Sequence, residues 1–259
     1  MSGLLIRLAG PLQSWGERSA FSWERDTAPF PTRSALVGMF AAAEGISRDD
    51  ADLEKYHELR ITVRVDRPGN RLIDYHTVGG GFPKDRTAAT SGGSNKGAAV
   101  VTNRHYLADA VFVVAVSATN ETVERLADAL SHPCWAPYLG RRSCPPDEPF
   151  LLRRCVDDPE EELRTRVPLS RTAPLQQSAG TPLAVEFLWE QAPPRSGKAA
   201  APLGVIEVND EPVNFAQHGR RYAGRRLYRT IESVPRDLAG PQEALMSRLI
   251  DYAHAEELA

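Results

Sequence analysis

The sequence predicts an α+β protein built around a ferredoxin-like arrangement of strands and helices. Segments with continuous or alternating apolar residues, typical of strands, are interleaved with segments whose apolar residues recur at helical spacing. Their order is strand, helix, strand, glycine-rich insertion, strand, helix, strand, which is the split βαβ arrangement. The expected strands are residues 4–8, 60–66, 108–117 and 150–156, and the expected helices are residues 32–44 and 119–131.

Both helices have recognisable ends. Thr32 or Ser34 can cap the first helix, and Gly45 supplies the left-handed residue that ends it. The second helix stops before Pro133. We expect both helices to cover one face of an antiparallel sheet, which leaves the other face or its loops free for a ligand.

The insertion between the two halves spans residues 79–102 and has almost no core-forming side chains. It is rich in glycine and small polar residues, and its cations are Lys84, Arg86 and Lys96. A strand at residues 71–78 is expected to lead into it. Such a composition fits a disordered segment or an extended hairpin that becomes ordered against a partner.

The last third of the chain predicts a second, smaller and mainly β unit. The expected domains are residues 1–156, which include the insertion, and residues 157–259. The second contains three expected strands and a terminal helix, at residues 183–189, 203–208, 226–234 and 241–257.

Composition and motifs limit the classes of function that the sequence allows. The formal net charge is −3, and no apolar run approaches the length that spans a bilayer. No signal peptide is evident, and three cysteines fit no zinc pattern, so we expect a cytoplasmic protein with reduced thiols, no metal and no cofactor. No Walker, GxSxG or HExxH motif occurs, and the aromatic motif of classical RNA-recognition domains is missing from the central strands.

Two segments suit an anion through backbone amides. Residues 10–16 form a turn after the first strand and include Gln13, Ser14 and Trp15. This turn either presents amides to a phosphate or packs Trp15 into the core. The second segment, with Thr32, Arg33 and Ser34, lies at a helix N-terminus, where Arg33 is unfavourable unless an anion is near.

Two further segments combine arginine with aromatic residues. The loop at residues 137–146 carries Tyr138, Gly140, Arg141 and Arg142 between prolines. Such a loop can contact phosphate and stack on a base, or it can be a charged surface turn. Residues 218–229 hold five arginines and two tyrosines, which suits RNA or a protein interface equally.

His76 and His105 flank the insertion and raise the possibility of an enzyme. If the insertion is a hairpin, the two histidines and Lys96 could form an acid–base site for metal-independent RNA cleavage. The alternative is that each histidine is a hydrogen-bonded structural residue beside a tyrosine.

Five stretches in order resemble one family, the CRISPR-associated RAMP subunit of type I-E Cascade (the CasD family). They cover much of residues 4–155 and are residues 8–16, 30–34, 45–50, 74–78 and 137–145. The resemblance implies a modified RRM-like body with a hairpin thumb at residues 79–102. It also implies a non-catalytic subunit of antiviral defence that holds the crRNA 5′ handle and caps the backbone filament.

The resemblance further implies partners and contact residues. The expected partners are the crRNA 5′ handle, the backbone RAMP subunit and the large subunit of Cascade, with target DNA contacted indirectly and no membrane. Where the family has an acidic residue after an arginine, this chain has His105, which keeps the endoribonuclease alternative open. The expected RNA-binding residues are Gln13, Ser14, Trp15, Thr32, Arg33, Ser34, Lys96, Arg104, Tyr138, Gly140, Arg141 and Arg142.

Overall fold

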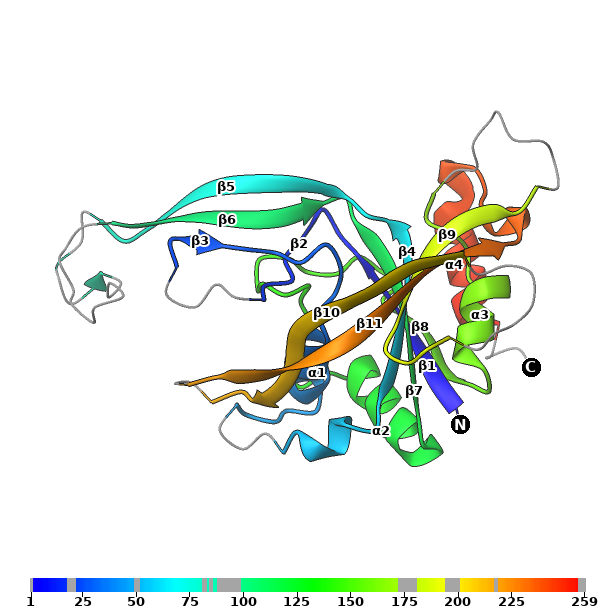
Figure 1. The fold of residues 1–259 in the computed structure, drawn as a ribbon, viewed down its shortest axis with the longest axis horizontal. Coiled ribbons are helices and arrows are strands. Elements are labelled where there is room, and N and C mark those ends of the chain that lie inside the picture. Colours follow the sequence, from blue (N-terminus) through cyan, green and yellow to red (C-terminus); the bar gives the residue numbers. More distant parts are fainter. Residues whose placement is uncertain are drawn as a thin grey trace.

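A seven-stranded sheet forms the body of the protein in the computed structural model (Figure 1). The structure describes residues 2–17, 22–48, 52–80, 83, 86–87, 99–171, 181–193, 201–216 and 219–255. Neighbouring strands of this sheet pair antiparallel, in the order β10-β11-β9-β4-β7-β1-β8. In chain order these strands are β1 Ser2–Ala9, β4 Arg60–Arg67, β7 Val111–Ala118, β8 Leu151–Val156, β9 Leu183–Trp189, β10 Ala201–Asn214 and β11 Arg221–Val234.

Four of these strands and two helices form the predicted ferredoxin-like unit. Helix α1 (Arg33–Ala43) connects β1 to β4, and α2 (Asn120–Ser131) connects β7 to β8. Because β7 lies between β1 and β4, each helix crosses over an intervening strand, as the split βαβ pattern requires. The Thr119 hydroxyl caps α2 by accepting a hydrogen bond from the Thr122 N–H. The predicted α+β class is confirmed.

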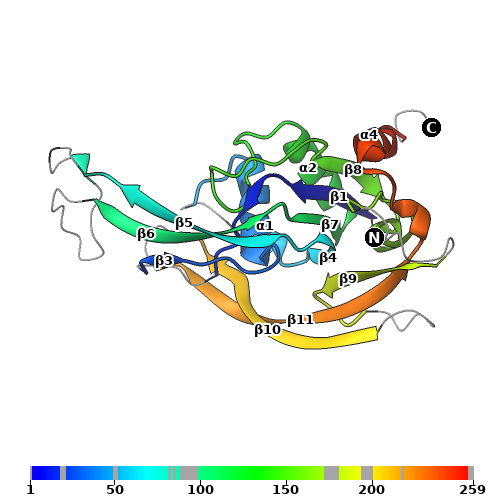
Figure 2. The ribbon, with the colours of Figure 1, turned by 90° about the horizontal axis from the view of Figure 1, so that it is seen from above.

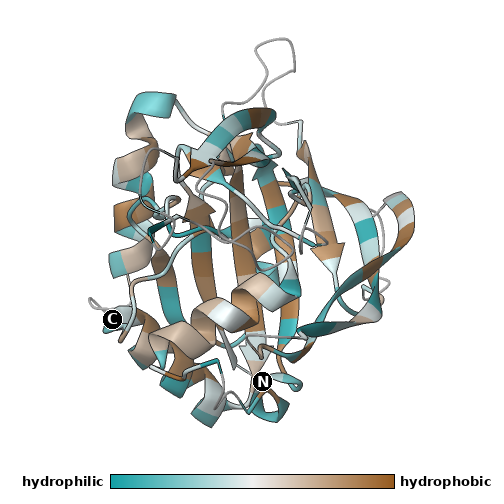
Figure 3. Ribbon diagram, turned by 90° about the vertical axis from the view of Figure 1, so that its left-hand side faces the viewer, coloured by the Kyte–Doolittle hydropathy of each residue, from teal (hydrophilic) through white to brown (hydrophobic). Residues whose placement is uncertain are grey.

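Both faces of the sheet are covered. Leu4, Ile6 and Leu8 of β1 pack into one core with α1 and α2. Leu5, on the opposite side of the strand, packs into a second core with α3 (Pro159–Thr165) and α4 (Leu245–His254). Figure 3 shows apolar residues, in brown, concentrated along the central strands. Of the two alternatives that the sequence left open, a free sheet face or free loops, the free face is wrong, because the C-terminal helices occupy that face.

A long hairpin leaves the body after β4. Strand β5 (Asn70–Val78) turns away from β4 and pairs with β6 (Val100–Ala108), in register from Asn70↔Ala108 to Val78↔Val100. The hairpin projects to one side in both views (Figures 1 and 2). Two short strands, β2 (Leu12–Gln13) and β3 (Glu24–Arg25), pair with the other edge of β6. Most of the insertion beyond this stem, including Lys84 and Lys96, lies outside the described residues, so the thumb stays a prediction.

The C-terminal strands do not form a sheet of their own. Strand β9 pairs with β4 from Thr62↔Trp189 to Val65↔Glu186, so β9, β11 and β10 extend the main sheet. Strands β10 and β11 are longer than the sequence predicts, because they continue as a two-stranded hairpin beyond the sheet. The division into two domains stays a prediction, although both parts share this sheet.

Short elements complete the described chain. They are three 3₁₀ helices, at Glu54–Tyr56, Arg236–Leu238 and Gln242–Ala244. Within the described residues, no helix combines the length and the hydropathy that a membrane span needs.

Candidate nucleic-acid interface

A groove of about 1280 Å³ brings together parts of all four segments that the sequence singles out. It lies between the loop at residues 137–146, helix α1, the stem of the β5–β6 hairpin and the free end of the β10–β11 hairpin. Among the described residues, six arginines and no Asp or Glu line it, and four aromatic side chains join them. Guanidinium groups suit phosphate and aromatic rings suit bases. The arginines are Arg25, Arg48, Arg104, Arg141, Arg142 and Arg220, and the aromatic residues are Trp135, Tyr138, Phe215 and Tyr222.

Helix α1 forms the floor of this groove, mostly with small side chains. Because residues three and four apart share one side of a helix, these positions make a single low face. A ligand can therefore approach the helix closely while the arginines reach it from the walls. The floor residues of α1 are Ser34, Ala35, Gly38, Met39, Ala41 and Ala42.

The loop at residues 137–146 is fixed to the turn after β1. The Ser14 N–H donates to the Leu139 carbonyl at 3.0 Å, and Leu139 itself is fully buried. Gly140 has a φ of +82°, and a Cβ there would lie 1.7 Å from the Ser14 carbonyl oxygen. Only glycine satisfies both conditions, so Gly140 sets the position of its neighbours Arg141 and Arg142.

Arg141 is held in place without an acidic partner among the described residues. Its guanidinium lies over the Tyr106 ring, 4.5 Å from the centroid, and Nη2 donates to the Arg25 carbonyl at 3.1 Å. Its Nη1 is buried and has no hydrogen-bond partner among the described residues. Arg142, the next residue, is exposed. A fixed, uncompensated guanidinium beside a second, exposed one is well suited to a bound anion.

Arg104 reaches the groove from the β5–β6 stem. It lies on β6 opposite Asp74, and its Nε donates to the Thr102 hydroxyl at 3.3 Å. Tyr138 and Ser34 also line the groove. The structure therefore brings Ser34, Arg104, Tyr138, Gly140, Arg141 and Arg142 of the predicted set to one surface. Ser14 lies at the edge of the groove but is 2% exposed, and its hydroxyl donates to the His105 carbonyl at 2.9 Å.

Gln13 and Trp15 are internal residues instead. Both are fully buried. The Gln13 amide donates to the carbonyls of Leu8 and Ala110 and accepts a hydrogen bond from the Trp15 indole. Their predicted contact with RNA is wrong, since every polar group of the two side chains is used within the fold. The alternative interpretation of this turn, in which Trp15 packs into the core, agrees with this burial.

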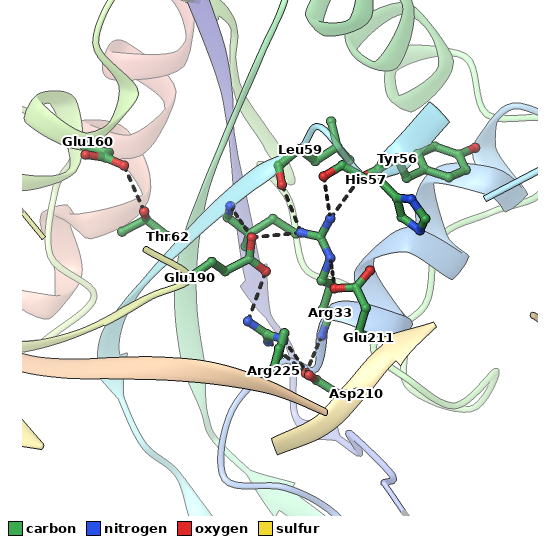
Figure 4. Close-up of polar contacts among 11 residues, drawn as sticks. Arg33, Tyr56, His57, Leu59, Thr62, Glu160, Glu190, Asp210, Glu211 and Arg225 are labelled. Atoms are coloured by element: carbon green, nitrogen blue, oxygen red, sulfur yellow. Dashed lines mark hydrogen bonds and ion pairs between the residues drawn. The ribbon is translucent and has the colours of Figure 1, made fainter. Parts of the chain in front are cut away.

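Arg33 is also internal, which corrects its predicted role (Figure 4). Its side chain is 4% exposed and donates to the carbonyls of Tyr56 and Leu59. It also forms ion pairs with Glu190 at 2.8 Å and Glu211 at 2.7 Å. With these contacts made, Arg33 is enclosed by protein groups and does not reach the groove.

The N-terminus of α1 does bind an anion, but that anion belongs to the chain. The Arg33 N–H donates to the Asp210 carboxylate at 2.8 Å, whereas the N-cap residue Thr32 is buried and makes no capping hydrogen bond. Burial raises the pKa of the nearby Glu190 carboxyl, and the charges of Arg33 and Arg225 oppose that rise. Sequence reasoning missed these acids because they lie more than 150 residues from Arg33.

His76 and His105 do not meet. His76 pairs with Thr102 and His105 pairs with Ile73, so they are three residues apart along the ladder, or roughly 10 Å. An odd separation also places the two side chains on opposite faces. His76 lies 3.3 Å from the Asp74 carboxylate instead. The predicted acid–base pair is therefore wrong, and its third member, Lys96, lies outside the described residues.

The described part of the chain offers no alternative catalytic centre of the metal type. It contains no group of three His, Cys, Asp or Glu side chains placed to hold a metal ion. The groove residues that sequence reasoning left out are Arg25, Arg48, Trp135, Phe215, Arg220 and Tyr222. Arg220 and Tyr222 lie in the arginine-rich segment at residues 218–229, whose composition alone could not show which surface it joins.

Comparisons of sequence and of structure relate the chain to known proteins. The family model described as CRISPR-associated protein (Cas_Cas5) matches residues 3–228. The CRISPR system Cascade subunit CasD of Escherichia coli (strain K12) is 38% identical over 182 residues, 65% of this chain and 78% of the relative. A chain of a solved CRISPR RNA-guided surveillance complex is 46% identical, with a TM-score of 0.84 over 97% of this chain and 99% of its own. A crystal structure of a Cas protein is 31% identical, with a TM-score of 0.61 over 92% and 97%.

Proposed function

The chain belongs to the CRISPR-associated Cas5 family, and from this premise we propose that it is a non-catalytic crRNA-binding subunit of a type I-E Cascade complex. The observation that carries the proposal is the groove, which is lined by six arginines, four aromatic residues and no described acid. The E. coli relative is a Cascade subunit, and the solved relative belongs to an RNA-guided surveillance complex. Both fit a groove built for single-stranded RNA.

The ligand of the groove in this proposal is the 5′ handle of the crRNA. Arg141 and Arg142 bind its phosphates, Arg104 binds from the hairpin stem, and Tyr138 offers a ring for stacking. By this binding the subunit caps one end of the backbone filament, next to the backbone RAMP subunit and the large subunit. Target DNA is then contacted only through the assembled complex.

The test is a double substitution in the loop. Replacing Arg141 and Arg142 with alanine leaves two phosphates without a cation, so affinity for a repeat-derived RNA falls. The slope of log K against log salt becomes shallower by about 0.7 for each phosphate that the protein no longer neutralises. Arg154→Ala with Arg166→Ala is the matched control, because it removes the same charge from exposed arginines that do not line the groove. Equal reductions in affinity in the two double variants would contradict the proposal.

The non-catalytic part of the proposal has its own test. Purified protein is incubated with repeat RNA in EDTA, and the products are separated on a denaturing gel. We expect intact RNA, because His76 and His105 lie on opposite faces of the β5–β6 ladder. A specific cut that disappears in His105→Ala would restore the endoribonuclease alternative.

A further inference from the structure

The β10–β11 hairpin has a free end that the main sheet does not hold. Strand β11 pairs with β9 only from Tyr228 to Val234. Its first half, from Arg221, pairs with β10 alone. Both views show the hairpin running past α1 and projecting from the same side of the body as β5–β6 (Figures 1 and 2). The groove lies between these two projections.

The free end is nevertheless fixed to the body by buried charges (Figure 4). Asp210 of β10 is 1% exposed; it accepts the Arg33 N–H and forms an ion pair with Arg225 at 2.5 Å. Arg225 also lies 3.1 Å from Glu190, and Arg33 pairs with Glu211 of β10. These five residues form one continuous network between α1, the residue after β9 and both strands of the hairpin.

Phe215 adds an apolar contact near the end of the hairpin. It is half-buried and packs against the core, and a Cβ at Gly38 of α1 would lie 3.8 Å from the Phe215 ring. The hairpin therefore lies against the floor of the groove at a defined height. The contact with α1 therefore supports the end of the hairpin and the side chains that it carries.

Two groups of side chains within residues 218–229 differ in their partners. Arg225 and Arg229 are paired with acids of the fold, at Asp210 and Glu186. Arg220 is exposed, lines the groove and forms no ion pair with any described residue. Tyr222, 37% exposed, lines the same wall. The first group builds the hairpin, and the second group is available to a ligand.

We propose that the free end of the β10–β11 hairpin is a second RNA-binding wall, with Arg220 on a phosphate and Tyr222 stacked on a base. It faces the loop at residues 137–146, so the single strand is held from both sides. The inference rests on the proposed function, since it names a further contact for the same RNA. A protein partner on this wall is the alternative, but the wall opens into the groove that holds Arg141.

The test compares neighbouring arginines in the full-length protein. Arg220→Ala and Tyr222→Ala are measured for binding to a labelled repeat-derived single-stranded RNA over a range of salt concentrations. We expect the first to reduce the salt slope by about 0.7, and the second to weaken binding about tenfold with little change in slope. Tyr222→Phe keeps the ring and should keep the affinity. Arg221→Ala is the matched control, because Arg221 is exposed but does not line the groove.

Photo-crosslinking to RNA that contains 4-thiouridine supplies the direct readout. The peptide with Tyr222 should carry the crosslink in the wild-type protein and lose it in Tyr222→Ala. If Arg221→Ala weakens binding as much as Arg220→Ala, a diffuse charge effect replaces the proposed wall. If neither Arg220 nor Tyr222 matters while the double substitution at Arg141 and Arg142 abolishes binding, the inference fails and the proposed function stands. If the wild-type protein does not bind the RNA, both are overturned.

Discussion

Adding one methyl group at Gly140 is the sharpest test of how the groove is built. In Gly140→Ala the new Cβ would lie 1.7 Å from the Ser14 carbonyl oxygen, far inside van der Waals distance, so the loop must move. The φ of +82° also costs a residue with a side chain about 1–2 kcal/mol. Breaking the hydrogen bond from the Ser14 N–H to the Leu139 carbonyl adds about 1 kcal/mol. We expect the free energy of unfolding to fall by about 2–3 kcal/mol in total.

Gly219→Ala is the matched control for this substitution. Gly219 has a similar φ of +77°, but no atom lies within 4 Å of the position of its Cβ. Its cost should be the conformational part alone, about 1–2 kcal/mol. Urea denaturation of both variants measures the difference. If Gly140→Ala is no more destabilising than Gly219→Ala, the close packing of the loop on Ser14 is not what positions Arg141.

Cys144 reports on the same loop. It is 1% exposed, and burial raises the pKa of its thiol, so it should react slowly with a thiol reagent. Cys134 and Cys155 are exposed and are first replaced by serine. In that background Gly140→Ala should speed the reaction of Cys144, because the displaced loop uncovers it. An unchanged rate would mean that the loop has not moved.

Three further outcomes follow from buried contacts. Arg33→Met removes the ion pairs that Arg33 forms with Glu190 and Glu211, so we expect the free energy of unfolding to fall by about 3–5 kcal/mol in urea denaturation. Arg33→Lys should not restore it, because Arg33 donates in several directions. Burial raises the pKa of Tyr56 and Tyr252, whose hydroxyls donate to Glu44 and Glu162. Tyrosines of the unfolded chain ionise near pH 10. Above that pH the folded state therefore keeps protons that the unfolded state releases. Stability should therefore fall as pH rises above about 10, and the double phenylalanine variant should show a flatter pH profile. Thr119→Ala should cost about 1 kcal/mol in thermal unfolding, and Thr119→Ser should retain most of the cap.

Local patterns were enough to predict the ferredoxin-like half. The alternation of Ile61, Val63 and Val65 and the helical spacing within residues 119–131 are properties of neighbouring residues. The bounds predicted for this strand and this helix lie close to the observed bounds. The pairing of β9 with β4 could not be predicted this way, because it joins segments more than 120 residues apart. No local pattern records which strand a distant segment will join.

The candidate site shows the same limit of prediction from local sequence, here for the chemical role of single residues. Arg33 and Arg141 looked equally suited to phosphate in the sequence. What separates them is Asp210, 177 residues from Arg33, which folds onto the helix terminus and brings Glu211 with it. Likewise, Arg33 and Ser34 are adjacent, yet Arg33 is enclosed whereas Ser34 is half-buried and lines the groove. The segments could be identified from local chemistry, whereas tertiary packing decided which side chain of each segment is available.

The late position of β10 and β11 in the chain has a consequence for synthesis. The floor of the groove is translated early, with α1, and the loop at residues 137–146 follows about 100 residues later, whereas Arg220 and Tyr222 leave the ribosome about 180 residues after α1. The buried charge of Arg33 likewise stays uncompensated until Glu190, Asp210 and Glu211 have emerged. A nascent or prematurely terminated chain therefore holds an open, incomplete groove. Under the proposed function, binding a strand from both walls therefore requires that residues 220–222 have been translated.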